Sequence, residues 1–158
     1  MRDLIQELSS FALEMCVALA GPMGVILVLV AFAFGLFMPK VMPKLTPFIL
    51  VCALVSSIIF GFLFTATSAG PGGQPQFHIA GWHYAEPAKM LIEREKWDQL
   101  PRVERDRQLL DLAGDDEALV WTASSLDFAR GFALLTAVLV SMVIGLLFGS
   151  LFNKKKEQ

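Results

Sequence analysis

The chain has 158 residues, of which 55% are hydrophobic and 18% are charged, and its formal net charge is −2. Charged residues make up about a quarter of an ordinary soluble domain, so this composition excludes a soluble enzyme, a nucleic-acid-binding domain and a disulfide-stapled secreted module. The apolar excess is concentrated in three runs. Each is near or above the roughly 20 residues that a helix needs to cross the hydrocarbon of a membrane.

The chain begins with an amphipathic leader, residues 1–14, in which apolar residues at helical spacing lie opposite acidic ones. The first uncharged run follows at 15–38. A signal-peptide core has only about 7–15 apolar residues and ends at a small-residue cleavage site, whereas this run is longer and ends in a stretch rich in Pro and Lys. The pattern therefore predicts a retained transmembrane helix.

A short link at 39–44 joins the first run to the second, 45–67, so these two runs are expected to form an antiparallel helical hairpin. Pro47 near the start of the second run occupies a position where a missing N–H costs least. The third run, 131–152, is followed by the basic tail 153–158. Upstream of it, Ser124 and Asp127 have capping-box spacing, which favours a helix start before the apolar run.

Lysines predict the orientation of the chain. The link and the tail carry Lys40, Lys44, Lys154, Lys155 and Lys156, opposed by a single Glu, whereas the leader and the long segment 68–130 are net acidic. Because Lys and Arg near membrane ends concentrate on the cytoplasmic side, we expect the N-terminus and residues 68–130 outside, and the link and C-terminus inside. We expect the membrane to be a bacterial inner membrane.

Small residues recur every four positions in two of the predicted spans. One row comprises Ala53, Ser57, Gly61 and Thr65, and the other comprises Ala133, Ala137, Ser141, Gly145 and Gly149. Such rows let two helix backbones approach closely within a membrane. Two interpretations stay open: the second predicted span packs on the third, or at least one row contacts a partner protein or a second copy.

None of the three spans contains Asp, Glu, Lys, Arg or His. Intramembrane charges usually mark proton relays, ion paths or voltage sensors, so their absence argues against a pump or an ion-coupled transporter.

The segment 68–130 is predicted to be mostly helical. It starts with a Gly- and Pro-rich exit at 68–76, followed by an aromatic and histidine cluster at 77–84 that suits the headgroup level of a membrane. Helices are expected over 87–99, over 101–113 with Gly114 as terminator, and from Asp115 or Asp116 onward. We expect too few large apolar residues for an independent core.

Two clusters in this segment could be taken for metal sites. His78, His83 and Glu86 are low-specificity candidates for metal or haem ligands, because imidazole is the commonest metal ligand but the spacing matches no ligand motif. Asp111, Asp115, Asp116 and Glu117 lack calcium-loop spacing and are expected to be a solvated helix end. We therefore predict no cofactor.

Taken together, the sequence predicts an all-α integral membrane protein with three transmembrane helices and a small helical extramembrane segment between the second and third. The expected partners are membrane lipid and other membrane-protein subunits or further copies of the chain, and not nucleic acid. The favoured function is a non-catalytic accessory or scaffolding subunit of a larger membrane complex. The alternatives are a homo-oligomeric, holin-like pore and a redox or metal-binding membrane subunit that uses the histidines.

Overall fold

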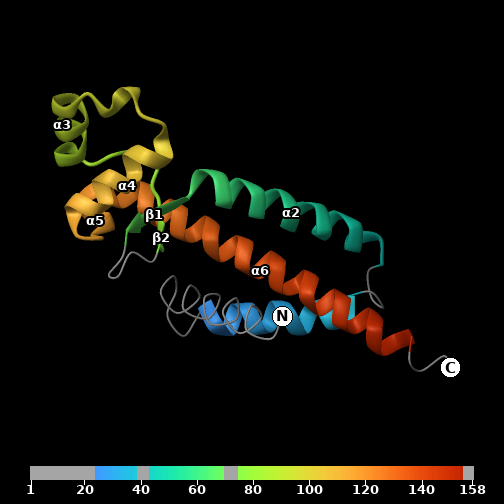
Figure 1. Cartoon of the computed structure of the whole chain (residues 1–158). Coiled ribbons are helices and arrows are strands. Elements are labelled where there is room, and N and C mark those ends of the chain that lie inside the picture. The colour runs from blue at the N-terminus through green and yellow to red at the C-terminus, as the bar shows by residue number, and fades with distance from the viewer. Residues whose placement is uncertain (1–23, 39–42, 70–74, 155–158) are drawn as a thin grey trace. The chain divides into compact units, whose positions relative to one another are not determined.

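The computed structural model describes residues 24–38, 43–69 and 75–154. The chain is mostly helical and divides into two compact units (Figure 1). One, the apolar unit, comprises residues 1–58 and 132–158. The other, the hairpin unit, comprises residues 59–131. The leader, the first part of the first predicted span and most of the predicted link lie outside the described residues.

The described helices of the apolar unit are an apolar helix Gly24–Met38, the 3-10 turn η1 Pro43–Leu45, α2 Thr46–Leu63 and α6 Ala123–Lys154; the last two extend into the hairpin unit. Within the described residues, α2 and the stretch Ala123–Ser150 of α6 are long and apolar enough to cross a membrane, and Gly24–Met38 is shorter. In the most apolar 18-residue stretches of α2 and α6, only 11% and 28% are buried, so most of the apolar residues of these two helices are not covered by the described protein.

The second predicted span extended to Thr67, whereas α2 ends at Leu63 and is followed by strand β1 Thr65–Ala69. This strand pairs antiparallel with β2 Pro75–Ile79, in a register that sets Thr65 opposite Ile79 and Ala69 opposite Pro75. Threonine favours the extended backbone, and pairing with β2 satisfies the N–H and C=O groups that leave the helix. The predicted irregular exit is therefore partly a two-stranded hairpin.

The remaining elements of the hairpin unit are α3 Glu86–Glu95, the 3-10 turn η3 Trp97–Gln99, α4 Arg102–Ala113, α5 Glu117–Val120 and the first turns of α6. The prediction for α4 is confirmed: Pro101 precedes it and Gly114, at φ 64°, ends it in the left-handed conformation that glycine tolerates. Asp116 caps α5 by accepting a hydrogen bond from the Ala118 N–H at 2.9 Å.

α6 begins at Ala123, one position before the predicted cap Ser124. The carbonyl of Thr122 accepts hydrogen bonds from the N–H groups of Ser125 and Leu126, each at 3.1 Å. Thr122 thus occupies the position that the spacing of Ser124 and Asp127 had assigned to Ser124. The expectation that this helix begins before the long apolar run is confirmed.

The hairpin unit has a hydrophobic core of its own, contrary to the sequence-based expectation. Its largest fully buried side chains include Trp121, Leu110 and Val120. Small residues let the strands and helices pack closely: a Cβ at Gly81 would lie 2.8 Å from the Cβ of Trp121. The remaining core residues are Ala66, Ala80, Ala88, Ile92, Leu109 and Leu126.

Candidate functional site

The small-residue row of α6 packs against the Gly24–Met38 helix. Ser141 donates a hydrogen bond across this contact to the carbonyl of Val28 at 2.8 Å. A Cβ added at Gly145 would collide with the carbonyl oxygen of Phe32, and one at Gly149 would lie 2.5 Å from that of Leu36. This row is therefore used within the apolar unit.

The first helix supplies the matching gap. A Cβ at Gly35 would collide with the carbonyl of Met142 on α6, and Ala31, four residues earlier, is buried. The spacing of Ala31 and Gly35 was therefore the sequence signal for the partner of this α6 row. The two N-terminal members of that row, Ala133 and Ala137, also lie on α6, and Ala133 is buried.

The small-residue row of α2 has different surroundings. Ala53 and Ser57 line an open apolar groove of about 420 Å³, together with Leu50 and Leu54 of α2 and Val140, Val143 and Ile144 of α6. The hydroxyls of Ser56 and Ser57 both donate to the carbonyl of Ala53, at 3.1 and 2.7 Å. Because the Ser57 hydroxyl already donates within α2, a molecule bound in the groove would be held by its fit to the apolar walls and not by a hydrogen bond from this serine.

The last two members of the predicted α2 row lie beyond this groove. Among the residues that the structure describes, and apart from the chain neighbours and the local helix backbone, no heavy atom lies within 4 Å of a Cβ added at Gly61. Thr65 is in β1 rather than in α2, and its hydroxyl donates to the carbonyl of Gly61 at 2.6 Å. The helical row therefore ends at Gly61.

Of the lysines that predict orientation, Lys44 lies in η1 and Lys154 is the last residue of α6. Each adjoins one end of a long apolar helix. Lys40, Lys155 and Lys156 lie outside the described residues.

The three candidate metal ligands lie in different surroundings. His78 is on β2, His83 precedes α3 and forms an edge contact with Trp82, and Glu86 pairs with Lys89 at 2.7 Å. Across the part of the chain that the structure describes, no group of three His, Cys, Asp or Glu residues could hold a metal ion.

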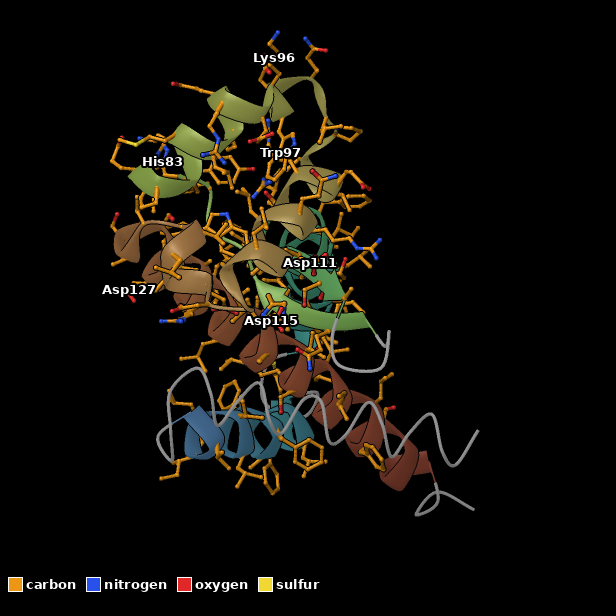
Figure 2. The ribbon with its side chains drawn as sticks, turned by 60° about the vertical axis from the view of Figure 1, so that its left-hand side comes forward. His83, Lys96, Trp97, Asp111, Asp115 and Asp127 are labelled. Carbon is orange, nitrogen blue, oxygen red and sulfur yellow. The ribbon has the colours of Figure 1, made fainter. Side chains whose placement is uncertain are left out.

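His78 belongs instead to a polar contact between the hairpin and the α4–α5 connection. Its Nε2 lies 2.9 Å from the Ser68 hydroxyl and 3.4 Å from Asp115 Oδ1, and its Nδ1 lies 3.6 Å from Glu117 Oε1. The imidazole is largely buried, with 11% of its side chain exposed. Figure 2 shows Asp115 beside the paired strands.

The acidic residues that the sequence suggested as a solvated helix end largely bind backbone. Asp111 accepts the Ala69 N–H at 2.9 Å, and Glu117 accepts the Ile79 N–H at 3.0 Å (Figure 2 labels Asp111). Glu117 also pairs with Arg130 at 3.3 Å. Carboxylates suit these positions because unpaired strand N–H groups are obligatory donors. Asp111 is exposed, as expected for a solvated helix end, whereas Glu117 is partly buried.

A second polar centre lies at Asp106 of α4, which is 2% exposed. The Tyr84 hydroxyl donates to Asp106 Oδ1 at 2.5 Å, and the Arg102 Nε donates to Oδ2 at 3.3 Å. The Arg102 guanidinium also donates to the carbonyls of Leu63 and Gly81, each at 2.9 Å. The buried Asp106 carboxylate thus orients Arg102, whose guanidinium binds the backbone at Leu63 and at Gly81.

Burial controls the ionisation of this centre. Desolvation raises the pKa of Asp106 above its ordinary value, although the Tyr84 hydroxyl and Arg102 oppose that shift. Desolvation, followed by the hydrogen bond to Asp106, raises the pKa of Tyr84 to about 12. Arg105 donates to the Tyr84 oxygen at 3.1 Å and its guanidinium lies over the ring. These groups are suited to holding elements together.

Aromatic rings gather where α2 ends and α6 begins. Trp82 stacks on Phe128 of α6 with ring centroids 4.5 Å apart, and Phe64, directly after α2, contacts both rings at 6.2 and 5.9 Å. Phe64 is buried, whereas Trp82 and Phe128 are 50% and 48% exposed. Tyr84, which the sequence grouped with Trp82 at the membrane surface, points to Asp106 instead.

Comparison of the chain with protein-family models, curated proteins and solved structures gives no match. The groove beside α2 is the candidate functional site of the chain.

Proposed function

We propose that the chain is an integral membrane protein that acts as a non-catalytic accessory or scaffolding subunit of a larger membrane complex. The observation that carries this proposal is the apolar groove at Ala53 and Ser57. Among the described residues it is open, whereas the corresponding row of α6 packs against the first helix. A partner helix would place its side chains in this groove.

Membrane insertion is supported by what α2 and α6 expose. Phe62, Phe48 and Leu54 of α2 are 82%, 66% and 63% exposed, and α6 similarly exposes Leu147. Monomeric soluble proteins rarely leave contiguous apolar patches of this kind in water. In a bilayer, hydrocarbon covers them without cost.

The proposed topology has three spans: the helix that includes Gly24–Met38, α2, and the apolar part of α6. The N-terminus and the hairpin unit lie outside, and Lys44 and Lys154 mark the cytoplasmic side of a bacterial inner membrane. The apolar spans carry no Asp, Glu, Lys, Arg or His, which favours contacts with other proteins over ion conduction.

The groove has the chemistry of a helix-binding surface. Small residues on one wall allow close backbone approach, and larger side chains such as Val140 and Ile144 form the other wall. Since its hydroxyl is satisfied within α2, affinity there comes from packing and is sensitive to added volume.

The test is native mass measurement of the tagged chain after extraction in mild detergent. We expect a complex heavier than one chain. Ser57→Leu, which fills the groove, should dissociate it, whereas Val55→Leu, which adds volume on the opposite side of α2, should not. A stable lone monomer of the unmodified protein would contradict the proposal, and a whole multiple of the chain mass would favour the homo-oligomeric alternative.

A further inference from the structure

We infer that Trp82 and Phe128 form an anchor at the membrane–water boundary, with their exposed ring surfaces in contact with lipid headgroups and the adjoining acyl chains. The inference rests on the proposed membrane location. It goes beyond the proposed function because it assigns a lipid-binding role to specific residues of the hairpin unit.

The first argument is the position of the rings along the chain. Phe64 directly follows the last residue of α2, and Phe128 lies three residues before the uncharged run that begins at Gly131. Trp82 stacks on Phe128 and contacts Phe64, and these two rings also contact each other. The cluster is therefore built at the point where two apolar helices meet polar sequence.

The second argument is the charge beside the rings. Asp127 and Arg130 flank Phe128 on α6, and their side chains are 77% and 43% exposed. Charged groups at these positions cannot lie in hydrocarbon without a large cost. Phe128 is thus held at a level where water or headgroups solvate its neighbours while the apolar helix continues on the other side.

The third argument is the chemistry of the exposed surface. About half of the Trp82 and Phe128 side chains remain exposed although the rings pack on each other and on Phe64. Tryptophan favours the headgroup region because its ring is amphipathic. The aliphatic stem of Arg130 can lie along the same boundary with its guanidinium in the polar layer.

The residues of the 77–84 segment therefore divide into two groups. Trp82 faces the boundary, whereas His78 and Tyr84 are engaged in polar contacts inside the hairpin unit. The polar atoms of His78 and Tyr84 are engaged by Ser68 and Asp106, so they are not available to lipid headgroups. The boundary role is therefore assigned to Trp82 and not to the whole segment.

Tryptophan quenching in vesicles tests the inference. The full chain is reconstituted in phosphatidylcholine vesicles that contain lipids brominated either near the headgroup or near the end of the acyl chain. We expect headgroup-proximal bromines to quench at least about twofold more strongly than deep ones, as for an interfacial ring. Trp82→Phe should remove most of this quenching, whereas Trp97→Phe should preserve it. Equal quenching of the parent and Trp82→Phe proteins would overturn the inference.

A second measurement needs no substitution at Trp82. The chain has three tryptophans, so fluorotryptophan labelling gives three fluorine resonances, which Trp97→Phe helps to assign. A headgroup spin label should broaden the Trp82 resonance more strongly than that of Trp121, which is 1% exposed and packs behind Gly81. Equal broadening of both would overturn the inference even if Trp82→Phe fails to fold.

Flotation of the vesicles separates the two proposals. A protein that floats but whose Trp82 is not quenched contradicts the boundary anchor and leaves the accessory role standing. A protein that floats, shows quenching at Trp82 and remains a monomer in mild detergent supports the anchor and contradicts the accessory role. A protein that does not float overturns both.

Discussion

The two units of this protein hold their elements together by opposite means. In the apolar unit, α6 and the Gly24–Met38 helix approach closely because Gly145 and Gly35 lack side chains at their contact. The large apolar side chains of this unit are mostly exposed. In the hairpin unit, a fully buried Trp121 and a buried Asp106 lie at the centre, and polar side chains connect separate segments.

The contrast follows from what surrounds each unit in the proposed membrane setting. Hydrocarbon provides no hydrophobic force between helices, so close packing and a few hydrogen bonds must bring them together. In water, burial of apolar side chains supplies the force, and each buried polar group needs a partner. The two units should therefore respond to different substitutions.

The largest effect is expected from Asp106→Ala. It removes the acceptor of the Tyr84 hydroxyl and of the Arg102 Nε. Since each hydrogen bond to a charged group contributes about 1.5–3 kcal/mol, the expected loss is about 3–5 kcal/mol. Amide hydrogen exchange by segment should show faster exchange throughout residues 75–122 and little change at 24–38. The exposed Glu104→Ala on the same helix is the control, and equal losses in the two variants would contradict the assigned role of Asp106.

The next effect is expected from Tyr84→Phe, at about 1.5–3 kcal/mol for a lost hydrogen bond to a charged group. Its pKa of about 12 lies above the ordinary 10.0, so the folded unit keeps its proton where the unfolded chain has lost it. Stability should therefore decrease as pH rises from 10 toward 12. Tyr84 is the chain's sole tyrosine, so phenolate absorbance reports it directly.

The Tyr84→Phe protein is also the control for this pH effect. Its stability should vary less than that of the parent over the same alkaline range, because the titrating group is gone. Phenolate formation in the folded parent near the ordinary pKa would show that Tyr84 is not buried against Asp106.

Gly145→Ala tests the close helix packing of the apolar unit. Alanine normally stabilises a helix interior by about 1 kcal/mol relative to glycine. Gly131→Ala, whose Cβ would meet no other described residue within 4 Å, should show that gain. At Gly145 the added methyl collides with the Phe32 carbonyl, and overpacking costs about 1–3 kcal/mol. Thermal unfolding in detergent should therefore shift in opposite directions, and a shift in the same direction would contradict close packing of α6 on the first helix.

The smallest effect is expected from Ser141→Ala. It removes the hydrogen bond to the Val28 carbonyl, and such bonds in membranes contribute about 0.6 kcal/mol on average. The same unfolding measurement should show a slight loss. A loss as large as that of Gly145→Ala would mean that polar contacts rather than backbone proximity hold the apolar unit together.

Local signals predicted the helices of the hairpin unit well. Pro101 and Gly114 bound α4 because each acts on its own backbone: one fixes φ for a first turn and the other accepts a left-handed ending. Asp116 similarly caps α5 from within the same turn. Signals of this kind do not depend on residues elsewhere in the chain.

Non-local partners account for most of what the sequence did not predict. Thr65 could have continued α2, and only its pairing with Ile79 makes the strand favourable. Likewise, the sequence around Asp106 gives no signal that its partner is Tyr84, which is 22 residues away in the chain. Of the candidate site, the small residues of α2 were predicted, but the groove depends on how Val140 and Ile144 of α6 lie beside them.

The hydrogen bond from Arg102 to the carbonyl of Leu63 has a consequence for biosynthesis. Leu63 is the last residue of α2, and its carbonyl obtains this donor from a residue 39 positions later in the chain. During translation, α2 is made well before Arg102 leaves the ribosome. The C-terminal end of α2 therefore acquires this hydrogen bond only after α4 has been synthesised. A segment made later thus completes the structure of a helix made earlier.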